Sequence, residues 1–177
     1  MATQELAAAL RRVQTVLQRR PELGLHDDAS ATAHWNGGTR VVSSHANGTQ
    51  IETDMPTELG GRGDRITPGW LMRAGFASCT ATCIAMSAAA QGIELESLDV
   101  QASSRSDTRG LFGMTGADGE PVPAGPSDMQ MRVRISAHGI DAQRLRTLVE
   151  DSYRQSPMAC AMRTAVPVEL RVDVNAA

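Results

Sequence analysis

The sequence has no lysine, few aromatic residues and only three cysteines. All 17 basic residues of the 177-residue chain are arginines, which excludes a catalytic lysine and any Schiff-base mechanism. Aromatic residues make up 3% of the chain, so the core must be built from Ala, Val, Leu, Ile and nine Met. A net charge of −3 and a pI near 5.8 provide no basic surface for nucleic acid.

The small number of cysteines also limits the chemistry. Three is an odd number, and no export signal is visible at the N-terminus, so we expect a reducing compartment and a cytoplasmic protein. The cysteines and the four histidines do not have the spacing of a metal site. We therefore predict neither a metal nor a cofactor. The length fits one domain with a real core.

The stretch 66–91 organises the chain. Thr67-Pro68 is typical of a helix start, and the apolar or small residues that follow include a single charged residue, Arg73. Cys79 and Cys83 lie at i and i+4, so both thiols point to the same side of a helix. The Ala, Ser, Thr and Gly content favours a soluble core helix over a membrane span. The pattern predicts a buried central helix, wrapped by the rest of the chain, that carries a thiol site.

Short elements surround this helix. Periodicity and turn residues predict helices at 3–20, 142–155 and 156–164, and strands at 29–35, 40–44, 50–54, 96–106, 129–137 and 166–174. Residues 107–127 are predicted to form either a wide mobile loop or a long hairpin tip. Because strands and helices do not alternate, we predict an α+β fold with mainly antiparallel sheets. Residues 1–28 form an N-terminal helix extension and linker, and 29–177 form a single domain.

Cys79 is the main candidate for chemistry. A reactive thiolate needs a positive charge nearby, and the arginines available around it are Arg40, Arg62, Arg65 and Arg73. Cys160 would be the second thiol of a two-cysteine peroxidase. The residues alone leave open that both cysteines are small buried hydrophobic groups.

The segment 58–81, ELGGRGDRITPGWLMRAGFASCTA, resembles the motif of the OsmC/Ohr family (osmotically inducible protein C and organic hydroperoxide resistance protein). In that family a Gly-rich loop and a Thr/Asn-Pro helix start lead to the active cysteine. The order of elements in the second half of the chain is also similar, including the DTRG end of a strand and the PAGP loop. The resemblance covers about residues 29–174.

This resemblance implies an intertwined α+β homodimer with two long central helices and active sites between the subunits. It implies reduction of organic hydroperoxides by a peroxidatic cysteine, here Cys79, and a resolving cysteine on the last helix. An arginine would activate the thiolate, and Arg40 is the nearest match. A dihydrolipoyl protein or another thiol reductant would reduce the disulfide again.

Two positions depart from the family pattern. Gly69 stands where a glutamate is expected, and Ser156 stands where the resolving cysteine is expected before a proline. Cys83 and Cys160 each lie one helical turn from the family positions. The leading hypothesis is therefore a thiol-dependent hydroperoxide reductase in which Cys160 resolves Cys79, either directly or through Cys83.

The substrate in this hypothesis is an apolar organic peroxide, because Phe76, Ile84 and Met86 lie on the helix around Cys79. Two alternatives remain open. One is a non-catalytic protein that binds an apolar small molecule in the dimer cavity. The other is a redox-sensing or interaction module in which the loop 107–127 binds a partner.

Overall fold

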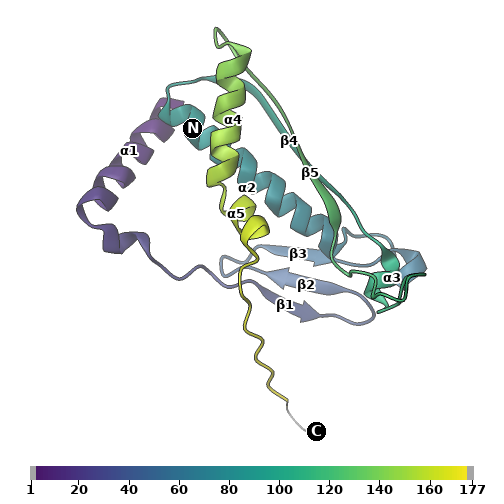
Figure 1. Ribbon diagram of the computed structural model, residues 1–177. Helices are drawn as coiled ribbons and strands as arrows, with labels where there is room; N and C mark the ends of the chain where they lie inside the picture. The colour runs from purple at the N-terminus through teal and green to yellow at the C-terminus, as the bar shows by residue number, and fades with distance from the viewer. Residues whose placement is uncertain (1–2, 175–177) are drawn as a thin grey trace.

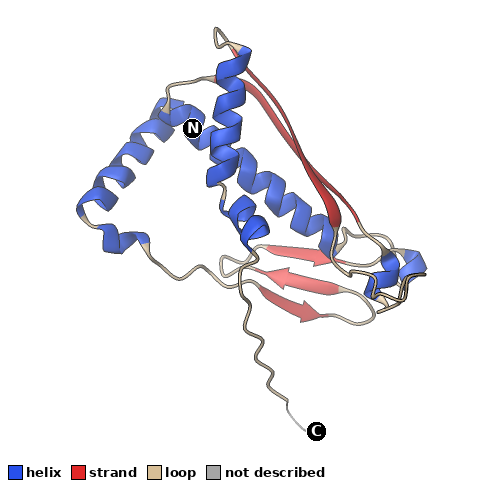
Figure 2. Cartoon of the chain, viewed as in Figure 1, coloured by secondary structure: helices blue, strands red, loops and turns tan. Residues whose placement is uncertain are grey.

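The central helix of the fold is α2, and it begins where the sequence predicts. The side chain of Thr67 caps it by accepting a hydrogen bond from the Trp70 backbone N–H at 3.1 Å, and Pro68 fills the first helical position. The computed structural model describes residues 3–174 (Figures 1 and 2). Its elements are α1 (Thr3–Arg19), η1 (Pro21–Gly24), β1 (Thr32–Trp35), β2 (Val41–Ser44), β3 (Gln50–Thr53), η2 (Thr57–Leu59), α2 (Pro68–Ala90), β4 (Leu95–Arg105), α3 (Thr108–Leu111), β5 (Ser127–Ala137), α4 (Ala142–Gln155) and α5 (Pro157–Thr164).

One face of α2 builds the core. Phe76, Thr80, Ile84 and Ala88 follow one another at helical spacing and are at most 3% exposed. Ala88 packs in one cluster with Ile93 after the helix and with two leucines of α4, Leu145 and Leu148. The rings of Phe76 and Tyr153, also on α4, lie 6.3 Å apart.

The other faces of α2 are not covered within this chain. Trp70 is 49% and Met86 39% exposed, and Gly75, Ser78 and Thr82 between them are exposed as well. The expectation that the rest of the chain wraps the helix is therefore wrong for a single copy. The reason is that α4 packs on the face that carries Phe76 and Ala88, and the other elements that contact α2 leave Trp70 and Met86 exposed.

Two antiparallel sheets confirm the predicted α+β class (Figure 2). β1, β2 and β3 form a three-stranded meander, in which Val42 pairs with both His34 and Glu52. Its turns use left-handed glycines, which lack the Cβ that opposes a positive φ: Gly37, Gly38 and Gly48. β4 and β5 form a long two-stranded ribbon that runs alongside α2 and α4 (Figure 1).

The N-terminal helix α1 packs against α2, and Ala7 is its buried residue. After η1 an exposed segment, 25–31, leads to β1. The division into an extension, 1–28, and a domain, 29–177, stays a prediction, and its outer limits lie outside the described residues. Within the expected loop 107–127 the chain forms the short helix α3, which Asp107 caps by accepting from the Arg109 N–H at 3.0 Å.

The predicted closing strand at 166–174 is wrong in this single chain. These residues form no ladder and extend away from the other elements (Figure 1). The segment does alternate as predicted, but both its rows are exposed, and its apolar side chains are 59–89% exposed: Val166, Val168, Leu170, Val172 and Val174. A strand needs a neighbour to accept its backbone hydrogen bonds, and no described strand lies beside it.

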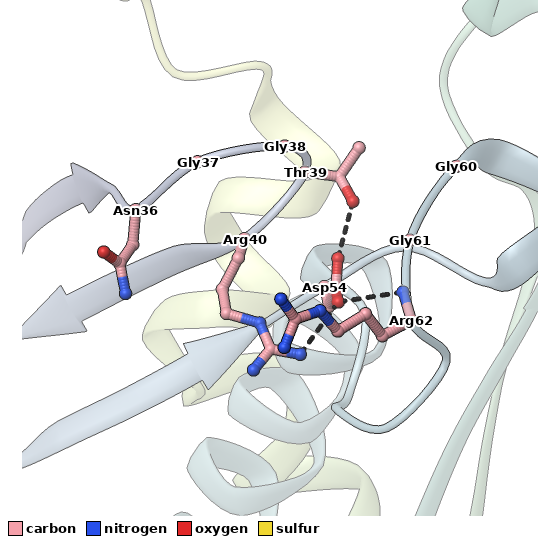
Figure 3. Close-up of a pocket in the computed structure, with 9 residues that line it drawn as sticks. All are labelled: Asn36, Gly37, Gly38, Thr39, Arg40, Asp54, Gly60, Gly61 and Arg62. Atoms are coloured by element: carbon pink, nitrogen blue, oxygen red, sulfur yellow. Dashed lines mark hydrogen bonds and ion pairs between the residues drawn. The ribbon is translucent and has the colours of Figure 1, made fainter.

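A buried carboxylate holds three loops together at the end of the three-stranded sheet (Figure 3). Asp54 is 2% exposed. It accepts hydrogen bonds from the Thr39 hydroxyl at 2.5 Å, the Arg40 guanidinium at 3.0 Å, the Arg62 backbone N–H at 3.1 Å and its neighbour's N–H at 2.8 Å. These donors, led by Thr39, lower the pKa of Asp54 far below its usual value.

We expect Asp54→Asn to lower the urea midpoint of unfolding at pH 7, because the amide has no charge for Arg40 and accepts through only one oxygen. The folded-state pKa of Asp54 is lowered. The contribution of Asp54 to the free energy of unfolding is therefore fully present above its pKa in the unfolded chain, which is about 4. It is lost as the pH falls toward the folded-state pKa. The difference between wild type and variant should shrink as the pH falls below about 4.

Asp107→Asn is the matched control, because Asp107 is 41% exposed and pairs with Arg109 at the surface. Its effect at pH 7 should be small. Equal effects of the two substitutions at pH 7 would contradict the role given to Asp54.

Candidate functional site

All three cysteines lie where α2 packs against α5. Cys79 and Cys83 are one turn apart on α2, and Cys160 lies on α5. Each is half-buried and none forms a disulfide. Cys83 interacts with both other thiols. The structure thus brings together the three cysteines that the sequence singles out.

Cys79 contacts Ser156, the residue that stands where the family pattern has a resolving cysteine. Its Sγ lies 3.3 Å from the Oγ of Ser156, and Ser156 is fully buried. Ser156 ends α4 and caps α5. The position at which the resemblance expects a second sulfur is therefore in direct contact with Cys79, but it holds a hydroxyl. The Ser-Pro pair before a helix predicts a cap, and no local signal predicts which side chain that cap contacts.

The surroundings of Cys83 oppose its ionisation. Burial raises the pKa of the Cys83 thiol, interactions with Cys79 raise it further, and the Ser156 hydroxyl opposes the rise. Cys83 is therefore a neutral thiol at pH 7. Residues at i and i+4 of a helix have Cβ atoms about 5–6 Å apart, whereas a disulfide brings them to about 4 Å. A bond between Cys79 and Cys83 would require α2 to unwind locally.

Cys160 is the cysteine that has an arginine beside it. Arg163 places Nη2 3.5 Å from the Cys160 Sγ, and the same nitrogen donates to the Arg154 carbonyl at 3.2 Å. The Cys160 thiol donates to that carbonyl at 3.3 Å. Sequence reasoning missed Arg163, although its i+3 spacing from Cys160 on a helix was a usable signal.

Two of the arginines expected near Cys79, Arg40 and Arg65, pair with acids elsewhere. Arg40 pairs with Asp54, Asp64 and, more distantly, Glu52, and the Asp54 hydrogen bond is the main cause of the raised pKa of its guanidinium. Arg65 donates to Glu52 at 2.6 Å. The guanidinium of Arg40 is bound to acids within residues 3–174, so its role as the activating arginine stays a prediction.

Arg40 lines a polar pocket of about 330 Å³ between two glycine turns (Figure 3). Asn36, Gly37 and Gly38 form one wall and Gly60, Gly61 and Arg62 another, with Asp54 at the base. Cysteines do not line this pocket. Arg73, the remaining arginine, contacts Ser104 of β4 at 3.4 Å, and a Cβ at Gly69 would lie 3.6 Å from its Nη1.

An apolar groove of about 470 Å³ lies within one to two turns of Cys79. Its α2 residues include Met72 and Gly75, which share a helix face with Cys79, and Met158 of α5 joins them. β2 contributes Val41 to the opposite side. The apolar surface near the thiol is thus real, but its residues differ from those expected, because Phe76 and Ile84 point into the core.

Metal and membrane sites are not evident in the described part of the chain. Residues 3–174 contain no cluster of three His, Cys, Asp or Glu side chains that could hold a metal ion. Within the same residues, each helix is too short or too polar to cross a bilayer.

Comparison with known structures reveals the same fold. An organic hydroperoxide resistance protein OsmC from Legionella pneumophila is 23% identical, with a TM-score of 0.57 over 79% of this chain and 92% of its own. An OsmC-like protein from Mycoplasma pneumoniae is 15% identical, with a TM-score of 0.65 over 79% and 90%. An organic hydroperoxide resistance protein from Elizabethkingia anophelis is 21% identical, with a TM-score of 0.59 over 79% and 91%.

A comparison with curated proteins gives no match. The model of the family described as OsmC-like protein matches residues 61–171. This match spans more than half of the chain and includes α2 with Cys79 and Cys83, both long strands, and the helices on either side of Ser156. Together with the shared fold, it confirms the resemblance seen in the segment 58–81: the chain belongs to the OsmC-like protein family.

Proposed function

We propose that this protein reduces organic hydroperoxides with Cys79 as the attacking thiolate. The observation that carries the proposal is the place of Cys79, half-buried where α2 meets α5, in hydrogen-bond contact with Ser156 and beside an apolar groove. Two of the structural relatives named above are described as organic hydroperoxide resistance proteins, and a hydroperoxide has the polar head and apolar tail that such a site accommodates.

In the first step the Cys79 thiolate attacks the outer oxygen of the hydroperoxide. A sulfur–oxygen bond forms as the oxygen–oxygen bond breaks, and the alkoxide leaves and takes up a proton to become an alcohol. Cys79 is now a sulfenic acid. The groove next to Met72 and Gly75 would hold the alkyl tail during this step, which favours apolar peroxides over hydrogen peroxide.

In the second step a thiol attacks the Cys79 sulfur, water leaves, and a disulfide forms. We assign this role to Cys160, because Arg163 places a positive charge beside its sulfur. Cys160 lies one helical turn beyond Ser156, so α5 must shift for the two sulfurs to meet. Cys83, a neutral thiol between them, is the alternative route. A dithiol reductant of the dihydrolipoyl type would return both cysteines to thiols.

We further propose that the active form is a homodimer. The uncovered face of α2 and the exposed segment 166–174 both need a partner, and a second copy of this chain could supply both. The alternation of Val168 and Leu170 with Glu169 and Arg171 fits an edge strand with one buried face. β1 offers an edge on which the described residues leave the backbone unpaired.

A second function is favoured by the same groove. An apolar groove near Cys79, in a chain where Ser156 stands in place of the family's second cysteine, would also suit a protein that binds an apolar molecule without reacting with it. Such a protein would have three slowly reacting thiols at about pH 7, whereas the enzyme should have one that reacts fast.

The assignment of the thiols predicts distinct outcomes for three substitutions. With cumene hydroperoxide and dihydrolipoamide, we expect Cys79→Ser to lower peroxide consumption to the rate without protein, because the attacking sulfur is gone. Cys160→Ser should consume one equivalent and then stall, since the sulfenic acid has no resolving thiol. Cys83→Ser is the matched control on the same helix face and should keep turning over.

The assay measures the hydroperoxide that remains in samples quenched at timed intervals. Equal rates in wild type and all three variants would exclude the peroxidase function and favour the binding function. A stalled Cys83→Ser protein would instead move the resolving role to Cys83.

The proposed dimer predicts different effects for two neighbouring residues of the tail. Leu170→Glu should weaken association at least about tenfold, because burying a leucine contributes about 1.5–3 kcal/mol. Arg171→Glu changes the opposite face of the segment and should leave the dimer intact. Sedimentation velocity over a range of protein concentrations measures both. A monomeric wild type, or two variants that dissociate alike, would contradict the pairing.

A further inference from the structure

Ser156 is a fully buried polar side chain at the junction of two helices. Its backbone N–H donates to the Tyr153 carbonyl at 3.2 Å, and its carbonyl accepts from the Cys160 N–H at 2.9 Å. With its backbone satisfied on both sides, Ser156 is held in place as the cap of α5. Pro157 adds to this, because a residue before proline is restricted to extended backbone angles.

The hydroxyl of Ser156 has one proton and two acceptor positions. One acceptor position serves the cap, since the Ala159 N–H points at Oγ from 3.5 Å. The hydroxyl also contacts the Cys79 sulfur at 3.3 Å and interacts with the Cys83 thiol. A neutral thiol can donate to the hydroxyl, but a thiolate has no proton and can only accept. Once Cys79 ionises, its charged sulfur is a stronger acceptor for the Ser156 proton than the neutral Cys83 thiol.

The surroundings make this hydrogen bond important. Among the arginines around the thiols in residues 3–174, Arg40 and Arg65 are bound to acids, Arg73 contacts Ser104, and Arg163 lies at Cys160. Ser156 caps the N-terminus of α5, so Cys79 lies beside the positive end of that helix, which favours a thiolate. The opposing effect of Ser156 on the pKa of Cys83 has the same sign, because a donor favours a thiolate.

We propose that Ser156 is a catalytic residue, whose hydroxyl donates a hydrogen bond to the Cys79 thiolate while that sulfur attacks a hydroperoxide. The role rests on the proposed function. It gives this chain a way to stabilise the thiolate without a guanidinium, at a position where the family resemblance expects a second cysteine. At the position of the resolving cysteine, Ser156 thus supplies a hydroxyl that activates Cys79. Another thiol must then resolve the sulfenic acid.

The first test measures ionisation of Cys79 by the rate of iodoacetamide alkylation from about pH 5 to 10. The background carries Cys83→Ala and Cys160→Ala, so that Cys79 is the one thiol of the chain. Adding Ser156→Ala should raise the pH of half-maximal rate by about one unit, since a hydrogen bond to a charged group is lost. Ser156→Thr keeps the hydroxyl and the cap, and its profile should match the background.

A structural effect of losing the cap must be separated from the loss of the donor. Ser156→Gly also lacks the hydroxyl but keeps most of the capping preference. It should show the same shift as Ser156→Ala with a smaller change in thermal midpoint. A pH profile that stays unchanged in both the Ala and the Gly variant would overturn the proposal.

The second test uses Ser156→Cys in the same background. After one equivalent of cumene hydroperoxide, the background protein should gain one oxygen atom, seen by mass spectrometry and trapped by dimedone. Ser156→Cys should instead lose both free thiols, because the new thiol attacks the sulfenic acid, water leaves, and a disulfide forms across the short contact. A stable sulfenic acid in this variant would contradict the geometry.

The two proposals can fail separately. If hydroperoxide oxidises none of these proteins while the alkylation profile still moves with Ser156, the peroxidase function fails and the thiolate donor stands. If hydroperoxide is consumed and the profile does not move, the function stands and the role of Ser156 fails.

Discussion

The burial of α2 is the constraint on which the rest of this structure depends. The helix is apolar or small on nearly every side, yet within residues 3–174 its fully buried residues are Phe76, Thr80, Ile84, Ala88 and Ala89. The remaining faces expose small residues and methionine to solvent. An apolar helix this long is stable only when other elements exclude water from it. The tail at 166–174 likewise exposes apolar side chains. In the proposed homodimer, a second copy of the chain would cover both surfaces.

The polar residues singled out by the sequence lie in two separate clusters. In one, Asp54 and its donors hold together the loops at the end of the three-stranded sheet, and Arg40 is one of those donors. In the other, three thiols and Ser156 meet between α2 and α5 with a single guanidinium, that of Arg163. A mechanism that needs Arg40 at Cys79 would first have to break its ion pairs. The use of a hydroxyl at Cys79 avoids this cost.

The sequence predicts the local elements well because their signals are local. Thr67-Pro68, Asp141 and Ser156-Pro157 each cap the helix that the pattern indicates, and the turns at Gly37-Gly38 and Gly48 separate the predicted strands. The resemblance adds the topology and the position of Cys79. Contacts between distant residues were not predictable in this way. Nothing in the spacing of Cys79 and Ser156, or of Arg40 and Asp54, shows which partner each side chain finds.

The predictions that were wrong also concern contacts between distant residues. The closing strand was predicted from a correct alternation, but a strand also requires a neighbour, and the neighbour is missing from this chain. Phe76 and Ile84 were expected near the substrate because they are close to Cys79 in sequence. On the helix they lie on a different face from Cys79, and that face points into the core. Arg163 lies 84 residues after Cys79 in the sequence, so only its i+3 spacing from Cys160 on α5 could have indicated its place beside a thiol.

The direction of the tail is set by one residue. Ala165 follows α5 directly and has φ 42° and ψ 73°, a left-handed conformation that costs a residue with a Cβ about 1–2 kcal/mol. Glycine would adopt it without strain but would also leave the chain free to rotate there. An alanine at this junction therefore stores strain, and its restricted backbone sets the direction in which the last strand-forming residues leave α5.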